Sequence, residues 1–524
     1  MKSRNRAGVA SAGFWSRGAK AVLALVVAMM AVRFVVAGTI GLVPDEMYYW
    51  LWSKNLALSY FDHPPAVAYF IRLSTAVGGD GPLGVRWLAV VLSGLLSAGV
   101  YRLALRLYAD RRLALAAAAL LQATLFIGFG SIFVTPDTTL VLFWLLALLA
   151  AAEVLRTGRG EWWLAAGAAV GLAFLSKYSA LFLGFGLLVW VIFVPEMRHW
   201  LRSPWPYAGA VLAVVVMLPV LIWNAQHDWA SFKFQFGRAM PRSFDPSFLP
   251  EFLIGQILLL TPLVAVLAIH GCRLGLRGTA ARREGGNALL VATTLPLLLY
   301  FVYHALFARV EGNWTAPLLP ALSVLAAAAA VSVTDAGSRA TILQFSARWA
   351  VPTGVALALA LLLHAEFRLL RLARDPLAQA AGWKELVREV ERLAVEHGAG
   401  AMAGVSYQVA SALRYFGTGE RTALQLSERI RYAMEPQSDP AAFIARPVLI
   451  LVEPREGCRA VVGAERAFAR VELVGTLERK WRGTPVEPYL VLSASEPRSP
   501  GLPDLTIPRR DRSVDCSRLR KLRP

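Results

Sequence analysis

The chain of 524 residues is 56% hydrophobic and only 17% charged, with a mean hydropathy of +0.51. A soluble domain carries about 25% charged residues, whereas this chain arranges its apolar residues in repeated runs of roughly 17–25, the length that crosses a bilayer. These features exclude a soluble enzyme, and the formal charge of +19, which lies mostly in short loops and in the C-terminal part, favours contact with anionic lipid headgroups over nucleic acid.

The chain begins with a basic segment, residues 1–20, followed by an apolar run at 21–43. The apolar core of a signal peptide has about 7–15 residues. Because this run is longer, we interpret it as an uncleaved first span that follows a cytoplasmic N-terminus. Arg33 lies inside the run, and a charge there usually faces the interior of the helix bundle, since lipid does not solvate it.

Eleven apolar runs are predicted as membrane spans that form one domain over residues 21–367. They cover residues 21–43, 88–106, 113–131, 138–155, 162–176, 179–195, 207–225, 251–271, 288–305, 317–334 and 349–367. The fifth and sixth runs are short and meet at residues 176–178, so full and partial crossing are both open interpretations for these two. The N-terminus and the even-numbered loops hold 18 Lys and Arg residues, against 8 in the odd-numbered loops. Positive residues favour the cytoplasmic side, so the odd loops and the part after residue 367 are predicted to lie outside.

This topology gathers polar side chains at one face of the membrane. The residues and segments predicted on the outer side are Asp45, Glu46, Asp62, His63, Asp137, Lys177, residues 224–229 (NAQHDW) and residues 309–314 (RVEGNW). The inner loops carry short basic runs instead. We therefore expect the functional site on the outer side.

The C-terminal part changes character, because residues 368–490 are rich in charged side chains and predict a small α/β domain. Residues 383–396 have apolar positions at the spacing of an amphipathic helix. Short strands are predicted at residues 401–405, 448–452 and 489–493. Residues 491–524 are rich in Pro, Arg and Ser, which predicts a basic, disordered tail.

The three cysteines, Cys272, Cys458 and Cys516, lack the spacing of a metal site such as C-x-x-C. Cys458 and Cys516 fall on the same predicted side of the membrane. A disulfide between them and two separate thiols are both open interpretations.

The most informative stretch is residues 44–65, PDEMYYWLWSKNLALSYFDHPP. Asp45 and Glu46 are either a solvated helix terminus or carboxylates that take a proton from an attacking hydroxyl. The aromatic segment at 47–60 is typical of an interfacial helix at headgroup depth. Asp62 and His63 then precede two prolines that restrict the backbone, so this turn either presents an acid and an imidazole or simply re-enters the membrane.

Further short motifs follow in order. They are TPD at 135–137, LSKY at 175–178, WNAQH at 223–227, NWTAP at 313–317 and SYQ at 406–408. Together with DE at 45–46 and YFDHPP at 60–65, this series resembles the membrane glycosyltransferases of the protein O-mannosyltransferase superfamily. It is most similar to the bacterial branch that includes the lipid A aminoarabinose transferases and the rhizobial galacturonosyltransferases, over about residues 20 to 490.

The resemblance implies a GT-C fold, in which a helical membrane domain carries an extracytoplasmic domain, in the inner membrane of a bacterium. It implies a polyprenyl-phosphate-linked sugar as donor and a lipid, glycan or protein as acceptor on the periplasmic side. A lipid-linked donor also accounts for a site at the membrane face without a nucleotide-binding loop such as G-x-G-x-x-G. Modification of lipopolysaccharide or another envelope glycan is the expected role.

Within this scheme, Asp45 is expected to act as the base or to orient the acceptor, with Glu46 beside it and Asp137 as a second acid. Lys177 is expected to meet the donor phosphate as a point charge, and Tyr178 to stack on the sugar or the prenyl chain. Further substrate contacts are expected from Asp62, His63, Asn313, Trp314 and Arg309. Asn313 and Trp314 are equally well explained as anchors at the end of a loop.

One position departs from the family pattern, because His63 stands where the aminoarabinose transferases typically have Lys. The phosphate contact is therefore expected to depend more on Lys177, with Arg309 or Arg238 in support. Asp62, His63 and His227 are also candidates to hold a divalent metal; no cofactor is otherwise predicted.

A transporter or flippase of lipid-linked sugars is the alternative function. Transporters often have broken helices near the middle of the membrane and matching repeats. Here the polar residues gather at one face instead, which favours an enzyme.

Overall fold

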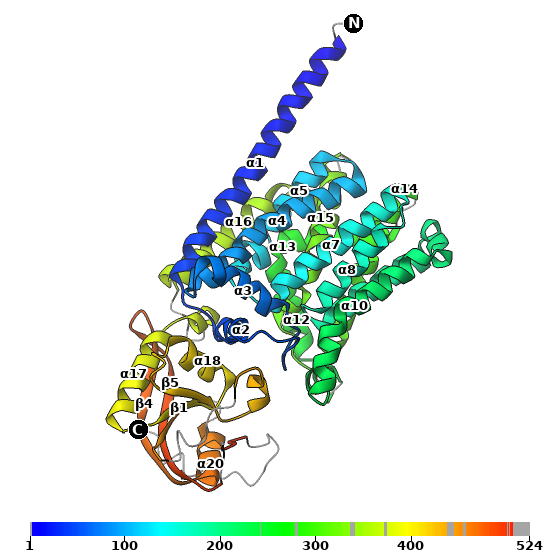
Figure 1. Ribbon diagram of the computed structural model, residues 1–524. Helices are drawn as coiled ribbons and strands as arrows, with labels where there is room; N and C mark the ends of the chain where they lie inside the picture. Colours follow the sequence, from blue (N-terminus) through cyan, green and yellow to red (C-terminus); the bar gives the residue numbers. More distant parts are fainter. Residues whose placement is uncertain are drawn as a thin grey trace. The chain divides into compact units, whose positions relative to one another are not determined.

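The structure is a computed structural model of the chain, drawn in Figure 1. It describes residues 3–240, 243–277, 281–335, 341–370, 372, 375–436, 445–453, 457–499, 501 and 503–506. The chain divides into two compact units. The first comprises Met1–Thr39 and His63–Leu369, and the second comprises Ile40–Asp62 and Leu370–Pro524.

The first unit is a bundle of helices. Its α-helices are α1 (Ser3–Thr39), α3 (Ala66–Gly78), α4 (Pro82–Tyr108), α5 (Arg111–Gln122), α6 (Leu125–Gly128), α7 (Pro136–Thr157), α8 (Trp162–Phe174), α9 (Leu181–Phe193), α10 (Pro204–Gln226), α11 (Ala230–Ala239), α12 (Phe248–Leu260), α13 (Pro262–Arg277), α14 (Ala281–His304), α15 (Leu319–Asp335) and α16 (Thr341–Phe367). Short 3-10 helices are η1 (Gly130–Ile132), η2 (Tyr178–Ala180), η3 (Pro195–Arg202) and η4 (Gly312–Leu318). Helices α4, α7, α8 and α10 pack one against the next (Figure 1).

The apolar runs of the sequence correspond to helices, and the predicted polytopic membrane protein is confirmed. Among the described residues, seven helices are long and apolar enough to cross a membrane, and ten spans result if each of three bent pairs counts as one. The remaining predicted run is α8, an apolar helix of 13 residues. The run at 251–271 is not one straight span, because α12 and α13 meet at an angle of 101° where Pro262 prevents the helix from continuing.

Arg33 of α1 faces the interior of the bundle, as predicted. Its side chain is fully buried and donates to the carbonyl of Gly128, to Ser93 Oγ and to Gln122 Oε1 at 3.0, 3.0 and 2.7 Å. Three neutral acceptors thus satisfy a desolvated guanidinium. They also tie α1 to the bend between α5 and α6.

The second unit contains a five-stranded mixed sheet in the order β2-β1-β3-β5-β4. The strands are β1 (Ala401–Gly404), β2 (Thr422–Gln425), β3 (Val448–Val452), β4 (Phe468–Trp481) and β5 (Thr484–Pro497). Strand β1 pairs in parallel with β2 and β3, whereas β5 is antiparallel to β3 and β4. Strands β1 and β3 are buried throughout, as expected for parallel strands covered on both faces.

Helices surround this sheet. They are α2 (Pro44–Lys54), η5 (Pro376–Ala380), α17 (Trp383–Glu396), α18 (Tyr407–Phe416), η6 (Arg429–Tyr432) and α20 (Gly457–Ala467). The predicted helix at 383–396 and the three predicted strands are confirmed. The predicted tail at 491 begins too early, because β5 pairs in the sheet up to Pro497; most of the predicted tail lies outside the described residues.

The segment with the aromatic residues belongs to the second unit and not to the predicted domain at 21–367. Helix α2 packs on α18, and its side chains Tyr48, Tyr49 and Trp52 are buried. These three rings therefore contact protein, and the predicted position of the helix at headgroup depth stays a prediction. A helix with one apolar aromatic face suits a protein surface as well as a membrane surface, and here its partner is protein.

One of the open questions on cysteines is answered in part. Cys458 at the start of α20 is disulfide-bonded, whereas Cys272 of α13 is a free thiol. Cys516 lies outside the described residues.

Candidate active site

The first polar centre lies in the first unit and is built on an ion pair between Asp137 and Lys177. The Lys177 ammonium nitrogen lies 2.9 Å from each carboxylate oxygen of Asp137, and the two side chains are only 5% and 12% exposed, Asp137 the less so. Asn313 Nδ2 donates a further hydrogen bond to Asp137 Oδ2 at 2.6 Å. Such pairing lets charges lie inside a helix bundle, where an unpaired charge is strongly unfavourable.

Helix ends place these side chains. Asp137 lies in the first turn of α7, directly after Pro136, where the helix dipole favours a carboxylate. Lys177 lies between α8 and η2 with an extended backbone (φ −160°, ψ 141°). Because α8 ends before Lys177, this side chain is not held on the surface of a helix and reaches the start of α7.

A cavity of about 190 Å³ adjoins this ion pair. Lys177 Nζ and Arg238 Cζ, both from residues that line it, lie 5.7 and 5.4 Å from the centre of the Trp314 ring, so two cations contact one aromatic ring. Other lining residues are His63, Tyr178, Phe182, Phe236, Tyr300 and His304. Positive charge beside aromatic and apolar walls suits an anionic headgroup attached to a hydrocarbon chain.

A second cavity of the first unit, of about 310 Å³, lies next to Asp137, the other residue of the ion pair. Asp137 and Asn313 line it together with apolar side chains of α4, α6 and α7. Lys177 lines the first cavity and Asp137 the second. A change in the ion pair would therefore affect both spaces.

The other predicted site residues of the first unit make contacts that the sequence did not predict. Tyr178 lines the first cavity, but its phenol oxygen lies 2.7 Å from Ser231 Oγ of α11. Arg309 pairs with Glu251 at 3.0 Å on the exposed surface and does not line the cavity. His227 stacks on Trp223 at 4.0 Å, so it supports the end of α10.

The second polar centre lies in the second unit and contains Asp45. The Tyr407 hydroxyl, on α18, donates to Asp45 Oδ1 at 2.8 Å. Glu46 is fully buried, and its Oε2 accepts the backbone N–H of Val43 at 3.1 Å. Asp45 is partly exposed by contrast, so the neighbouring carboxylates differ in their surroundings: Glu46 accepts a hydrogen bond at the start of α2, and Asp45 is accessible from outside.

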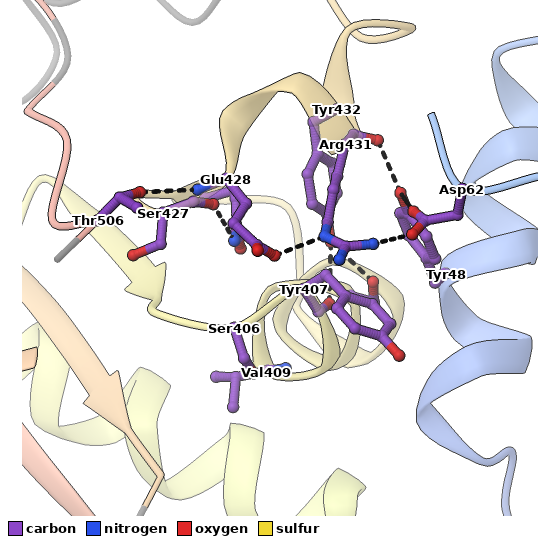
Figure 2. A network of polar contacts seen from close by, with 12 residues as sticks. Tyr48, Asp62, Ser406, Tyr407, Val409, Ser427, Glu428, Arg431, Tyr432 and Thr506 are labelled. Atoms are coloured by element: carbon purple, nitrogen blue, oxygen red, sulfur yellow. Dashed lines mark hydrogen bonds and ion pairs between the residues drawn. The ribbon is translucent and has the colours of Figure 1, made fainter. Parts of the chain in front are cut away.

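Asp62 is the acceptor of a network that Figure 2 shows. The Arg431 guanidinium pairs with Asp62 Oδ1, and Arg431 Nε donates to Glu428 Oε2 at 2.6 Å. The Tyr48 hydroxyl lies 2.8 Å from Asp62 Oδ2 and 2.9 Å from the carbonyl oxygen of Arg431. Asp62 therefore links α2 to η6 inside the second unit. Its predicted contact with the substrate stays a prediction.

Burial shapes the electrostatics of this second centre. Burial raises the pKa of Asp45, while the hydrogen bond from Tyr407 lowers it and the charges of Asp62 and Glu46 raise it further. Burial also raises the pKa values of Tyr48 and Tyr407 well above the usual value of a phenol. Both hydroxyls are therefore protonated donors at neutral pH.

The predicted metal ligands do not come together as a cluster. No group of three or more His, Cys, Asp and Glu side chains among the described residues has an arrangement that could hold a metal ion. Asp62 pairs with Arg431, and His227 Nδ1 lies 2.8 Å from the carbonyl oxygen of Trp223.

Sequence reasoning missed several residues of these centres. Arg431 carries no motif of its own, and Tyr48 was noted only as part of the aromatic segment at 47–60. His304 lines the first cavity without any sequence motif that indicates it. Arg238 was named only as a reserve for the phosphate contact. Tyr407 did have a signal, since it lies in the SYQ motif at 406–408, but the motif gave it no chemical role.

Comparisons with known proteins agree with this architecture. Residues 62–223 match the family model of dolichyl-phosphate-mannose-protein mannosyltransferase. The lipid A galacturonosyltransferase RgtD of Rhizobium johnstonii is 28% identical over 298 residues, which are 54% of this chain and 59% of that protein. An undecaprenyl phosphate-α-4-amino-4-deoxy-L-arabinose arabinosyl transferase of Edwardsiella ictaluri is 30% identical over 302 residues, 53% of this chain and 50% of that protein. The chain thus spans between half and three fifths of the length of these two curated relatives.

The fold is shared over a larger part of the chain. The crystal structure of ArnT from Cupriavidus metallidurans in the apo state matches with a TM-score of 0.62 at 17% identity, covering 91% of this chain and 98% of that one. The same protein bound to undecaprenyl phosphate matches with a TM-score of 0.61. The predicted resemblance is therefore confirmed: this chain has the GT-C fold and is similar to membrane glycosyltransferases of the protein O-mannosyltransferase superfamily.

Proposed function

We propose that this protein is a glycosyltransferase that moves a sugar from a polyprenyl-phosphate donor to an acceptor outside the cytoplasm. The observation that carries the proposal is the cavity beside the Asp137–Lys177 pair, in which Lys177 and Arg238 flank Trp314 within a GT-C fold. Two cations suit a phosphate, and the aromatic and apolar walls suit the prenyl chain. The crystal structure of the relative ArnT with undecaprenyl phosphate supports the same class of ligand.

The reaction exchanges one bond at the anomeric carbon of the donor. An acceptor hydroxyl forms the new bond to that carbon, the bond to the phosphate oxygen breaks, and its electron pair leaves with the polyprenyl phosphate. Lys177 and Arg238 stabilise the charge that develops on the phosphate. His63, which lines the same cavity, adds to this stabilisation when its imidazole is protonated. Tyr178, Asn313 and Trp314 shape the space for the donor.

Asp45 takes the proton of the acceptor hydroxyl in this proposal. A general base must lie within hydrogen-bond reach of the proton it removes, and Asp45 is the partly exposed carboxylate of its centre. Glu46 holds the start of α2, and Asp137 orients Lys177 through their ion pair. Asp62 and Arg309 receive no catalytic role.

The active site is proposed to face the periplasm of a bacterium, with the helices in the inner membrane. The distribution of Lys and Arg supports this orientation. The disulfide at Cys458 supports it as well, because disulfides persist in oxidising compartments such as the periplasm.

The names of the relatives suggest which substrates to try. They specify lipid A as the molecule modified by RgtD and an undecaprenyl-phosphate-linked aminoarabinose as a donor. We propose a lipid, glycan or protein acceptor of the envelope, with lipid A the first candidate. The matching family model and the two curated relatives are named as transferases, so the transporter alternative gains no support from them.

The test is transfer by the purified protein in detergent. Undecaprenyl phosphate carrying either 4-amino-4-deoxy-L-arabinose or galacturonic acid is supplied with lipid A, and mass spectrometry follows the acceptor. We expect transfer from one donor, and loss of at least a hundredfold in rate in Asp45→Asn, since general base catalysis contributes roughly 10²–10⁴-fold. Asp245→Asn, an exposed carboxylate bonded to Ser247, is the matched control.

Full transfer by Asp45→Asn would remove the base assignment. Movement of the intact donor across a vesicle membrane, without any transfer to an acceptor, would favour a transporter.

A further inference from the structure

The hydrogen bond to Asp45 comes from a residue whose backbone is unusually well fixed. Tyr407 is the first residue of α18, and Ser406 caps that helix by accepting the N–H of Val409 at 3.2 Å. The Ser406 hydroxyl in turn donates to Glu453 Oε1 at 2.7 Å. The start of α18 is thereby tied to the residue that follows strand β3.

The ring of Tyr407 is also fixed from its sides. The Tyr48 ring lies 5.0 Å from it, centre to centre, and the Arg431 guanidinium lies 4.8 Å from its centre. The Tyr432 hydroxyl donates to the carbonyl oxygen of Tyr407 at 3.0 Å. In Figure 2, Tyr407 lies beside the guanidinium of Arg431, with Tyr432 and Tyr48 around them.

This fixed phenol occupies one oxygen of the carboxylate and leaves the other. Its O–H donates to Asp45 Oδ1 at 2.8 Å. Asp45 Oδ2 accepts no hydrogen bond from the residues that the structure describes. A carboxylate held through one oxygen has a fixed orientation, and its second oxygen is then available to a substrate hydroxyl.

We propose that Tyr407 is a positioning residue that orients the Asp45 carboxylate. The C-terminal α/β part of the chain would thereby contribute a hydrogen bond to the proposed general base. The inference rests on the proposed role of Asp45. It gives the α/β part a task in the reaction, which neither the fold nor the relatives' names assign to it.

The groups around Asp45 determine in which direction its pKa should change when the Tyr407 hydroxyl is lost. Asp62 and Glu46 raise the pKa of Asp45, and Arg431 and the Tyr407 hydrogen bond lower it, against the larger effect of burial, which raises it. The loss of the phenol removes one of the two effects that favour the ionised form. The carboxylate should then take up its proton at higher pH.

The first measurement needs no substrate. A hydrophobic carbodiimide reacts with protonated carboxyl groups, and peptide mass spectrometry gives the labelled fraction of Asp45 between pH 4 and 9. We expect Tyr407→Phe to move the midpoint of labelling to higher pH. Tyr489→Phe is the matched control, because it removes a buried phenol that donates to Glu487 Oε2 in the same unit; its midpoint should equal that of the unchanged protein.

The second measurement is transfer from the undecaprenyl phosphate sugars to lipid A. In Tyr407→Phe we expect kcat to fall roughly 10- to 100-fold, as for a lost hydrogen bond to a charged group. The acidic limb of the pH–rate profile should move to higher pH. The KM for the donor should stay within about twofold, since the phosphate contacts proposed above come from other residues.

The outcomes separate the two proposals. An unchanged labelling midpoint and an unchanged kcat in Tyr407→Phe, with Asp45→Asn inactive, would overturn the role of Tyr407 and leave the base in place. A shifted midpoint together with full transfer by Asp45→Asn would show that the Tyr407 hydrogen bond affects Asp45 but that Asp45 is not the general base. Both proposed roles in the reaction would then be wrong.

A second variant protects the test against a folding defect. Site-specific 3-fluorotyrosine at position 407 keeps the shape of the ring and makes its hydroxyl a stronger donor. The labelling midpoint should then move to lower pH, opposite to the change in Tyr407→Phe. A midpoint that does not move would count against the proposal even if Tyr407→Phe failed to fold.

Discussion

Lys177 holds both oxygens of Asp137 at 2.9 Å, so a phosphate that reaches this lysine would meet a cation already paired with a carboxylate. The pair is nearly buried, and Arg238 supplies a second cation over the same aromatic ring. A donor that brings two or more negative oxygens can share Lys177 with Asp137 and bind Arg238 as well. The affinity for the phosphate should therefore depend on Lys177 without depending on it alone.

Removal of the lysine tests this view. We expect Lys177→Ala to weaken binding of undecaprenyl phosphate, measured by titration in detergent, by roughly 10- to 100-fold, because a charge-assisted contact contributes about 1.5–3 kcal/mol. The KM for the donor should rise with it, while the KM for the acceptor changes little.

Lys233→Ala serves as the control, since Lys233 is exposed on α11 and does not line the cavity. If both variants lose affinity equally, net charge and not the cavity determines binding, and the phosphate role of Lys177 is wrong.

At the scale of single residues, the sequence identified the charged groups better than their tasks. The motifs at 135–137, 175–178 and 313–317 pointed to Asp137, Lys177 and Asn313, which the structure brings together. Arg309 was expected to contact the substrate and Arg238 was only an alternative, because spacing along a loop does not tell which arginine faces a cavity and which pairs with a surface carboxylate. Only the tertiary contact with Glu251 separates them.

At the scale of elements, the position of Lys177 depends on how closely α8 approaches α10. A Cβ on Gly167 would lie 1.9 Å from the carbonyl oxygen of Gly209, and one on Gly209 would lie 2.3 Å from that of Trp163. Small residues of this kind let two helix backbones approach closely in a membrane. Since α8 ends just before Lys177, a shift of α8 would also move the lysine.

We therefore expect Gly167→Ala to lower the melting temperature of the protein in detergent and to reduce transfer. Overpacking of a tight contact destabilises by about 1–3 kcal/mol. Gly255→Ala on α12 is the matched control, because nothing lies within 4 Å of its Cβ position and alanine favours a helix over glycine by roughly 1 kcal/mol. Equal melting temperatures for both variants would show that α8 and α10 do not approach as closely as described.

Periodicity and apolar length located the helices but could not predict their partners. The run at 251–271 contains Pro262, yet it reads as one continuous apolar segment and folds as two helices bent by 101°. Helix α2 has the aromatic residues of a membrane-surface helix and buries them against α18. The bend has a local cause at Pro262 that the apolar pattern does not reveal, whereas the partner of α2 comes from residues far away in the sequence.

At the scale of the whole molecule, the side on which the α/β part lies follows from the number of crossings. Within the described residues, seven single helices and three bent pairs give up to ten spans, and the short helix α8 is the eleventh predicted crossing. With eleven crossings, an odd number, the two ends of the bundle are predicted to lie on opposite sides. The excess of Lys and Arg in the even loops predicts a cytoplasmic N-terminus. The proposed periplasmic side of the other end is consistent with the disulfide at Cys458, since disulfides persist in oxidising compartments.

Reporter fusions test this arrangement directly. Alkaline phosphatase, which is active only in the periplasm, should be active when fused after Ala380 and inactive when fused after Ser203, in a predicted inner loop. A fluorescent protein that folds only in the cytoplasm should give the reverse pattern. If the fusion at Ala380 were active only as the fluorescent protein, the α/β part would lie in the cytoplasm. The proposed periplasmic site would then be wrong, because Asp45 and Tyr407 belong to the same compact unit and share a hydrogen bond.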